Sequence, residues 1–336
     1  RHDKWLCMMY PRLKLLQKLL ADDGVIFISI DDTECSNLIL ICNEIFGASN
    51  FVANVSWQRT YSPRNDSKGI VSEVEHLVVF SKNPGWQPNK LPRTEAMDSR
   101  YKNPDNDVAP WKSSDAFAPG AATHQGMVYA IQHPFTGEML YPSNGRCWRY
   151  QQSSMLEYMQ GWCNYRLENL HDEKERARVC GIDESAVRKD VLAIVLEEPL
   201  EVSAAKAQKV YNRGRWPGFY FTKGGYGGIA RKTYLENVGG RLPTNLWMYE
   251  ETGHTDEAKK ELISLFGGRS PFDTPKPTRL LDFVLKVAGT SETLMLDSFA
   301  GSGTTAHAVL NANKADNGNR HFILIEMMDY ADSITA

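Results

Sequence analysis

Residues suited to chemistry gather in a glycine-containing turn near the end of the sequence. The run reads Asp297-Ser298-Phe299-Ala300-Gly301-Ser302-Gly303-Thr304-Thr305-Ala306, with both glycines in a G-x-G-x-x-A pattern. An apolar segment precedes the run and a helical pattern follows it, the context in which such a turn binds an adenosine-bearing ligand. Glycines allow a tight turn and a close approach of backbone to ligand. We therefore expect a cofactor to contact Phe299, Gly301, Ser302, Gly303 and Thr304.

Two acids narrow the choice of cofactor. Glu326 follows the next predicted strand, about 20 residues beyond the turn, where a carboxylate can hold both ribose hydroxyls. The Gly-Lys-Ser/Thr ending of a P-loop is missing. Asp297 ends the strand before the turn, where it would repel a diphosphate but favour the ammonium and sulfonium groups of S-adenosylmethionine. These residues favour S-adenosylmethionine, while a nicotinamide dinucleotide or a turn without a ligand remains open.

The glycine turn also carries a resemblance. It is similar to the cofactor motif of the amino-group DNA methyltransferases, and Phe272-Asp-Thr-Pro-Lys276-Pro277 resembles their methionine-binding motif. The order of the two motifs matches the permuted β-class. Further segments resemble the modification subunit of type III restriction–modification systems: Trp5-Leu-Cys-Met-Met-Tyr-Pro-Arg-Leu, Asp23-Gly-Val-Ile-Phe-Ile-Ser-Ile-Asp-Asp-Thr-Glu, Asn103-Pro-Asp-Asn-Asp, Pro110-Trp-Lys-Ser-Ser-Asp and Gly253-His-Thr-Asp-Glu-Ala-Lys-Lys-Glu-Leu. The resemblance covers nearly the whole chain and places Lys276 and Pro277 beside the methionine carboxylate.

One motif of that family is missing. Its catalytic tetrapeptide, Asp-Pro-Pro-Tyr, should lie on a strand before the helix that starts at Asp3, yet no such tetrapeptide or close variant occurs in the 336 residues. In the family its carboxylate and adjacent carbonyl accept hydrogen bonds from the target amine, and its aromatic ring stacks on a flipped base. The sequence also begins at Arg1 rather than Met. We therefore expect a fragment without catalytic residues of its own that does not methylate at a useful rate.

The resemblance implies a function for the intact protein. It would transfer a methyl group from S-adenosylmethionine to the exocyclic N6 amine of adenine in double-stranded DNA. Its partners would be a second modification subunit, forming a homodimer, and a restriction subunit with helicase and nuclease activity. Methylation of cytosine N4 is an open alternative within this class. An NAD-dependent oxidoreductase, which Asp297 disfavours, and a non-catalytic DNA-binding module are alternatives from other classes.

The predicted elements suggest how these residues are positioned. Helical patterns alternate with apolar runs that indicate buried strands, which is typical of a doubly wound α/β fold with a mostly parallel, Rossmann-like sheet. We expect helices at residues 3–20, 38–46, 257–266, 278–287 and 304–310, and strands at residues 25–30, 51–57, 77–80, 293–296 and 321–325.

The middle of the chain differs in amino-acid composition. Pro, Gly, Asn, Trp and Tyr become frequent, which predicts an irregular α+β module inserted into the sheet domain. We place the first part of the catalytic domain at residues 1–83, a target-recognition module at 84–250 and the cofactor-binding part at 251–336. Residues 206–247 hold eight Lys or Arg against one acid, Glu236, which fits a local phosphate-contacting face or a solvated surface.

Several side chains are candidates for DNA contact. Those suited to phosphates or guanine edges are Arg146, Arg149, Arg213, Arg215, Lys223, Arg231 and Lys232. Trp148, Trp216, Tyr220 and Tyr226 could stack on bases or fill the module's core. Asp31, Asp32 and His76 follow or precede strands and are candidates for a target-base pocket. The competing interpretations are helix capping for the two aspartates and an ordinary hydrogen bond for the histidine.

Composition excludes other classes. Hydrophobic residues make up 42% and charged residues 24%, as in globular proteins, and the net charge is −3. Apolar runs are far below the roughly 18 residues of a membrane span, and no signal peptide is evident. The six cysteines are scattered without a C-x-x-C pair, so we expect reduced thiols and no metal site. These features suggest a cytoplasmic protein with no membrane partner, and the resemblance to restriction–modification proteins implies a bacterial or archaeal cell.

Overall fold

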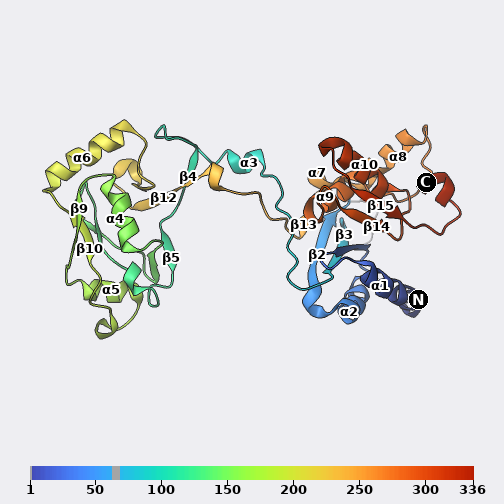
Figure 1. The fold of residues 1–336 in the computed structure, drawn as a ribbon, viewed down its shortest axis with the longest axis horizontal. Coiled ribbons are helices and arrows are strands. Elements are labelled where there is room, and N and C mark those ends of the chain that lie inside the picture. The colour runs from blue at the N-terminus through green and yellow to red at the C-terminus, as the bar shows by residue number, and fades with distance from the viewer. Residues whose placement is uncertain (1, 63–68) are drawn as a thin grey trace. The chain divides into compact units, whose positions relative to one another are not determined.

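The computed structural model describes residues 2–62 and 69–336. The chain divides into two compact units, one made of Arg1–Pro92 with Gly240–Ala336 and the other of Arg93–Gly239 (Figure 1). Composition alone places the boundaries at 83/84 and 250/251. The difference arises because Trp86, Leu91 and Trp247 pack in a core cluster of the first unit.

The main sheet of the first unit is mixed. Its strand order is β1-β3-β2-β13, made of β1 (Val25–Ile30), β3 (Val74–Ser81), β2 (Phe51–Gln58) and β13 (Leu246–Trp247). β3 runs antiparallel to both β1 and β2, and only β13 pairs in parallel with β2. The expectation of a mostly parallel sheet is therefore wrong here, because an apolar run indicates burial but not the direction of the neighbouring strand.

Helices nevertheless cover both faces of this sheet (Figure 1). α1 (His2–Leu19) and α2 (Cys35–Phe46) pack with Val78 and Phe80 on one face, and Pro11 lies within the continuous α1. On the other face, α9 (Thr278–Ala288) packs against side chains such as Val55 and Leu77. Two further helices complete the unit, α7 (Tyr249–Thr252) and α8 (Thr255–Leu265). The layering is thus that of an α/β fold.

A parallel β-α-β unit carries the glycine turn. β14 (Leu294–Asp297) pairs in parallel with β15 (His321–Leu324), and α10 (Thr304–Asp316) connects them. The register joins Asp297 to Leu324, so both strands end at the same edge. α10 packs on α9 through Leu285, Ala308 and Val309. The chain ends in the short helix η6 (Ala331–Thr335).

The second unit is an α+β assembly of short elements. Its sheets are β11-β12-β4, β7-β6-β10-β9 and β5-β8. The strands are β4 (Trp111–Asp115), β5 (Phe117–Pro119), β6 (Ile131–Gln132), β7 (Met139–Leu140), β8 (Arg146–Trp148), β9 (Tyr165–Glu168), β10 (Ala193–Leu196), β11 (Phe219–Phe221) and β12 (Ile229–Tyr234). The helices are α3 (Glu95–Asp98), α4 (Gln152–Gln160), α5 (Glu173–Cys180) and α6 (Leu200–Arg213). Large aromatic side chains, among them Tyr129, Trp148, Trp162 and Phe219, fill its main core and compensate for the shortness of its strands.

Candidate functional site

Both glycines of the turn after β14 adopt backbone conformations that other residues avoid. Gly301 has φ +51° and Gly303 has φ +75°, in the left-handed region. A Cβ at Gly301 would lie 3.1 Å from Cζ of Phe272, and one at Gly303 would lie 2.9 Å from the carbonyl oxygen of Thr335. The turn therefore requires glycine at both positions for backbone and steric reasons.

The Asp297 carboxylate organises this turn from the end of β14. One oxygen accepts a hydrogen bond from the backbone N–H of Phe299 at 3.1 Å, and the other accepts from the Thr305 hydroxyl at 2.6 Å. The acid thus connects the strand end to the first turn of α10. The Phe299 ring, 52% exposed, lies beside the guanidinium of Arg12, with 6.0 Å between ring centre and Cζ.

Glu326 lies against the same turn from the end of β15. Its Oε2 accepts from the Gly301 N–H at 2.9 Å, and its Oε1 accepts from the N–H groups of Met327 and Met328 at 2.9 and 3.1 Å. Burial raises the pKa of this carboxyl, but these backbone donors outweigh burial and leave the pKa below its usual value. The spacing of the sequence indicated the place of Glu326 but not its bond to the glycine turn.

The segment around Lys276 packs on the start of α10. The Thr304 hydroxyl donates to the carbonyl of Lys276 at 3.2 Å and lies 3.0 Å from the Ser302 hydroxyl. Pro277 is the residue before α9 and has extended backbone geometry. The structure therefore brings together Lys276, Ser302 and Thr304, three residues that the sequence predicts to contact the cofactor.

Sequence reasoning missed the partner of Lys276. Its ammonium group donates to the carboxylate of Glu75 on β3 and lies 5.2 Å from the centre of the Trp57 ring. Glu75 also accepts from the Ser29 hydroxyl of β1 at 2.5 Å, so one carboxylate joins two strands to Lys276. An acid at the start of the largely apolar strand Val74–Ser81 was the signal that could have revealed it.

Two of the three candidates for a target-base pocket, Asp32 and His76, are hydrogen-bonded to each other. His76 Nε2 lies 2.8 Å from Asp32 Oδ1, and this hydrogen bond lowers the pKa of the Asp32 carboxyl despite the opposing effect of partial burial. His76 Nδ1 is buried and has no hydrogen-bond partner within the described residues. Asp31 instead accepts from the N–H of Thr33 at 3.0 Å, a local turn. Neither aspartate caps α2, because the residue before that helix is Glu34.

The seven basic candidates of the second unit differ in exposure. Five are exposed: Arg146, Arg149, Arg213, Arg215 and Lys223. Arg146 pairs with Asp115 at 3.1 Å, and Arg231 is half-buried.

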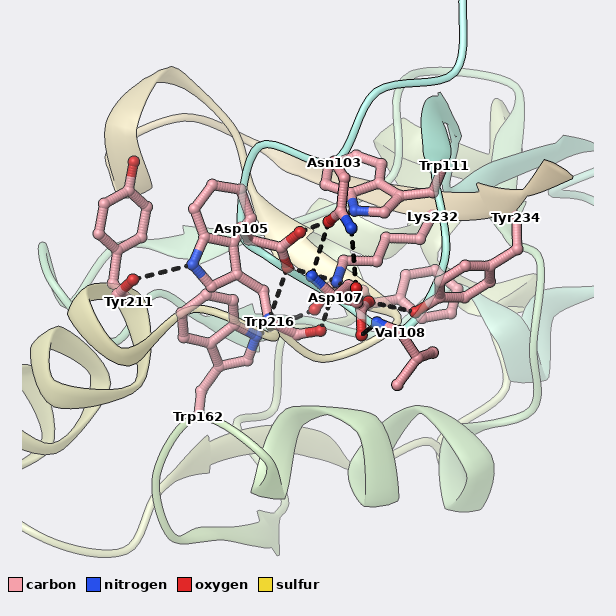
Figure 2. A network of polar contacts seen from close by, with 11 residues as sticks. Asn103, Asp105, Asp107, Val108, Trp111, Trp162, Tyr211, Trp216, Lys232 and Tyr234 are labelled. Carbon is pink, nitrogen blue, oxygen red and sulfur yellow. Dashed lines mark hydrogen bonds and ion pairs between the residues drawn. The ribbon is translucent and has the colours of Figure 1, made fainter. Parts of the chain in front are cut away.

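Lys232 cannot contact DNA as expected, because it is buried (Figure 2). Its ammonium lies 2.5 Å from carboxylate oxygens of both Asp105 and Asp107, and it donates to the carbonyl of Trp216 at 2.7 Å. A buried cation needs such partners, and these occupy all three of its donors. The charge pattern of the sequence could not distinguish this structural lysine from its exposed neighbours.

The aromatic candidates lie mostly in the core. Trp148 is buried and donates from Nε1 to the carbonyl of Tyr129 at 2.8 Å. Trp216 stacks against Tyr211 and Tyr220, with ring centres 4.8 and 5.7 Å away. Of the four candidates only Tyr226, 64% exposed, presents most of its ring to solvent.

Residues 2–62 and 69–336 contain neither a metal-ligand cluster nor a helix that could span a membrane. No cluster of three or more His, Cys, Asp or Glu in this part of the chain could hold a metal ion. Among the same residues, no helix is both long and apolar enough to span a bilayer.

Comparison with known proteins agrees with these motifs. The family model described as "DNA methylase" matches residues 1–335. The chain is 32% identical, over 96% of its length, to the type III restriction-modification enzyme StyLTI Mod subunit of Salmonella typhimurium. It is 28% identical over 97% to the EcoPI Mod subunit of Escherichia phage P1, and 27% over 97% to the type II methyltransferase M.KpnI of Klebsiella pneumoniae.

The matched part is only a portion of those relatives. The chain spans 40% and 45% of the two Mod subunits and 67% of the type II enzyme. Because the family model covers nearly every residue, including the glycine turn and both units, the family is not in doubt. The chain belongs to the DNA methylase family.

Proposed function

We propose that this chain provides the cofactor-binding and DNA-contacting parts of an S-adenosylmethionine-dependent DNA methyltransferase of a type III restriction–modification system. The observation that carries the proposal is the edge formed by β14 and β15, where Asp297 and Glu326 flank a glycine turn and the Lys276 segment packs against it. Two relatives named as Mod subunits support the assignment to that system.

The side chains at this edge fit S-adenosylmethionine by their chemistry. The cofactor carries two cationic groups and a carboxylate but no phosphate, so Asp297 suits the cations, while Lys276 and the hydroxyls of Ser302 and Thr304 suit the carboxylate. Glu326 would hold the ribose hydroxyls with the lone pairs that its backbone donors leave available. When bound, S-adenosylmethionine supplies an electrophilic methyl group. The task of these residues is to orient it, which lowers the entropic part of the barrier.

The target of the intact enzyme is proposed to be adenine N6 in double-stranded DNA, with cytosine N4 as the alternative. The exocyclic amine is a poor nucleophile because its lone pair is delocalised into the ring. Base flipping would bring this amine to the cofactor, and the Asp32–His76 pair would lie on the target-base side. A second modification subunit and a restriction subunit are the proposed partners, in the cytoplasm of a bacterial or archaeal cell.

Calorimetric titration of the chain with S-adenosylmethionine, and with NADH beside it, tests the cofactor. Asp297→Asn keeps one acceptor oxygen for the Phe299 N–H and offers its amide N–H to the Thr305 hydroxyl, but it removes the charge. We expect it to weaken S-adenosylmethionine binding by about tenfold or more. Asp23→Ala removes an exposed carboxylate before β1 and serves as the control. Unchanged affinity in Asp297→Asn, or binding of NADH instead, would overturn the cofactor assignment.

The absence of an Asp-Pro-Pro-Tyr tetrapeptide from these 336 residues leads to a further expectation. This polypeptide alone should bind S-adenosylmethionine without transferring its methyl group to duplex DNA at a useful rate. Transfer of a radiolabelled methyl group measures this, and turnover like that of an intact enzyme would contradict it. The same assay on the full-length gene product, followed by nucleoside analysis, distinguishes N6-methyladenine from N4-methylcytosine.

A further inference from the structure

Asp105 is the centre of a buried polar cluster in the second unit (Figure 2). The residue is buried, and its Oδ1 accepts from Nε1 of Trp111 at 2.8 Å. Its Oδ2 accepts from the Lys232 ammonium at 2.5 Å and from the backbone N–H of Trp216 at 2.7 Å. Lys232 also binds Asp107, which accepts from the Tyr234 hydroxyl at 2.6 Å. We call these residues the Asp105 cluster: Asp105, Asp107, Trp111, Trp216, Lys232 and Tyr234.

The cluster immobilises residues 214–216, which follow α6. The backbone N–H of Arg215 donates to the carbonyl of Asp105 at 2.7 Å, beside the bond from Trp216 to the carboxylate. Gly214 lies so close to the same carbonyl that a Cβ there would collide with it. The Trp216 ring stacks against both Tyr211 and Tyr220. The segment is therefore held both by backbone hydrogen bonds and by ring stacking.

The backbone of Arg215 is strained within this segment. Its φ is +51°, in the left-handed region where residues other than glycine are strained. Its side chain is exposed and forms no ion pair or hydrogen bond within the described residues. The cluster's two carboxylates are already bound by Lys232 and do not compete for the guanidinium. Folding gives no reason for an arginine here, since glycine would satisfy the backbone better.

We propose that Arg215 contacts a DNA phosphate and that the Asp105 cluster positions it for this contact. The inference rests on the proposed function, in which the second unit binds DNA. An exposed, unpaired guanidinium is a bidentate ligand for phosphate, and phosphate contacts set the register of a protein on a duplex. Holding the backbone rigid before binding reduces the entropy lost on association. Strain kept at one residue by a surrounding buried network is typical of functional positions.

Among the other basic candidates, Lys232 is buried, Arg231 is half-buried, and Arg146 is paired with Asp115. Arg149 and Lys223 are exposed, and Lys223 also has a positive φ of +50°. Neither donates its backbone N–H to the Asp105 cluster as Arg215 does. Arg213, two residues before Arg215, is exposed and adds positive potential beside the contact.

Binding of the full chain to fluorescent duplexes of several unrelated sequences, measured by anisotropy as a function of salt, tests the proposal. Arg215→Gly should weaken binding to all duplexes alike, reduce the slope of log K against log salt by about 0.9, and leave stability unchanged or higher. Arg215→Lys should recover part of the affinity. The matched control is Lys189→Gly, which removes an exposed cation from a loop of the same unit. Asp105→Asn should weaken binding through Arg215, so its effect and that of Arg215→Gly should not add.

The outcomes separate this proposal from the one it rests on. If Arg215→Gly and Lys189→Gly have the same affinity and salt slope, the phosphate contact is overturned. A change of preference among the duplexes would mean that the guanidinium reads a base, which also overturns it. If the unmutated chain binds S-adenosylmethionine but no duplex, the DNA-binding part of the proposed function fails, and this inference fails with it. Arg215→Gly needs no Asp105 variant to be interpreted, because glycine relieves strain and should fold.

Discussion

Lys232 shows how strongly the role of a charged side chain depends on residues far along the chain. Its neighbours in sequence suggest a phosphate contact, but its carboxylate partners, Asp105 and Asp107, lie more than a hundred residues earlier. Glu75 and Lys276 form another such pair, between a strand of the main sheet and the segment before α9. The spacing around the glycine turn did indicate Asp297 and Glu326, because both belong to one local β-α-β unit. Pairings between distant segments leave no comparable local pattern.

The burial of Lys232 leads to a stability prediction. Lys232→Met leaves two buried carboxylates without their cation, and removing one partner from such a buried network costs about 3–5 kcal/mol. We expect a loss of this size in the free energy of unfolding, measured with urea. Lys223→Met, at an exposed position, should change it by no more than about 0.5 kcal/mol. A Lys232 variant as stable as the Lys223 variant would show that the cluster contributes little.

At the scale of elements, the turn after β14 gives the next prediction. Gly303→Ala places a Cβ 2.9 Å from the Thr335 carbonyl at a φ of +75°. We expect a loss of about 1–2 kcal/mol from the left-handed backbone alone, together with weaker S-adenosylmethionine binding. Thermal unfolding and calorimetry measure the two effects. Gly228→Ala, with open space around its Cβ and no positive φ, is the control, and equal behaviour of the two variants would refute the prediction.

A buried histidine links two further elements and predicts a pH dependence. His133 follows β6; its Nδ1 accepts from the N–H groups of Phe135 and Thr136, and its Nε2 lies 3.3 Å from the carbonyl of Gly227. Burial lowers its pKa below 6.5, against the opposing effects of the Gly227 carbonyl and the charge of Glu138. The unfolded state therefore binds this proton more readily, so stability is complete above about pH 6.5 and declines as the pH falls toward the folded-state pKa.

Urea unfolding between about pH 8 and pH 5 measures this decline. In His133→Asn the free energy of unfolding should fall less steeply as the pH is lowered below about 6.5. His124→Asn, at an exposed position, should show the same fall as the unmutated chain. Identical slopes in both variants would exclude His133 as the cause.

The elements also show which parts of the fold a sequence can predict. The strand expected at 25–30 has the same bounds as β1, and the helix expected from 278 is α9, because continuous apolar runs and 3.6-residue periodicity are local properties. Strand direction is not local. The antiparallel pairing of β3 with both neighbours depends on which strands meet, and nothing within Val74–Ser81 specifies this.

The whole molecule consists of two units with separate cores. We expect two unfolding transitions rather than one, because each unit buries its own apolar cluster. S-adenosylmethionine should raise the transition temperature of only the unit that contains the glycine turn. The free energy of unfolding of that unit should increase by about 2.7 kcal/mol at a free concentration one hundred times its Kd. Scanning calorimetry with tryptophan fluorescence can follow both. A single transition that shifts as a whole would contradict this independence.

The two crossings between the units lie side by side. Leu91 and Arg241 form an antiparallel bridge with backbone hydrogen bonds of 2.8 and 2.9 Å, and the Arg241 side chain also donates to the carbonyl of Pro92. The chain thus leaves the first unit and returns to it at two adjacent positions that are hydrogen-bonded to each other. An insert whose ends are already joined can be lengthened, shortened or exchanged for a foreign segment without redesigning the host fold. Recombination at this pair of positions would exchange the second unit while the first unit, with its glycine turn, stays intact.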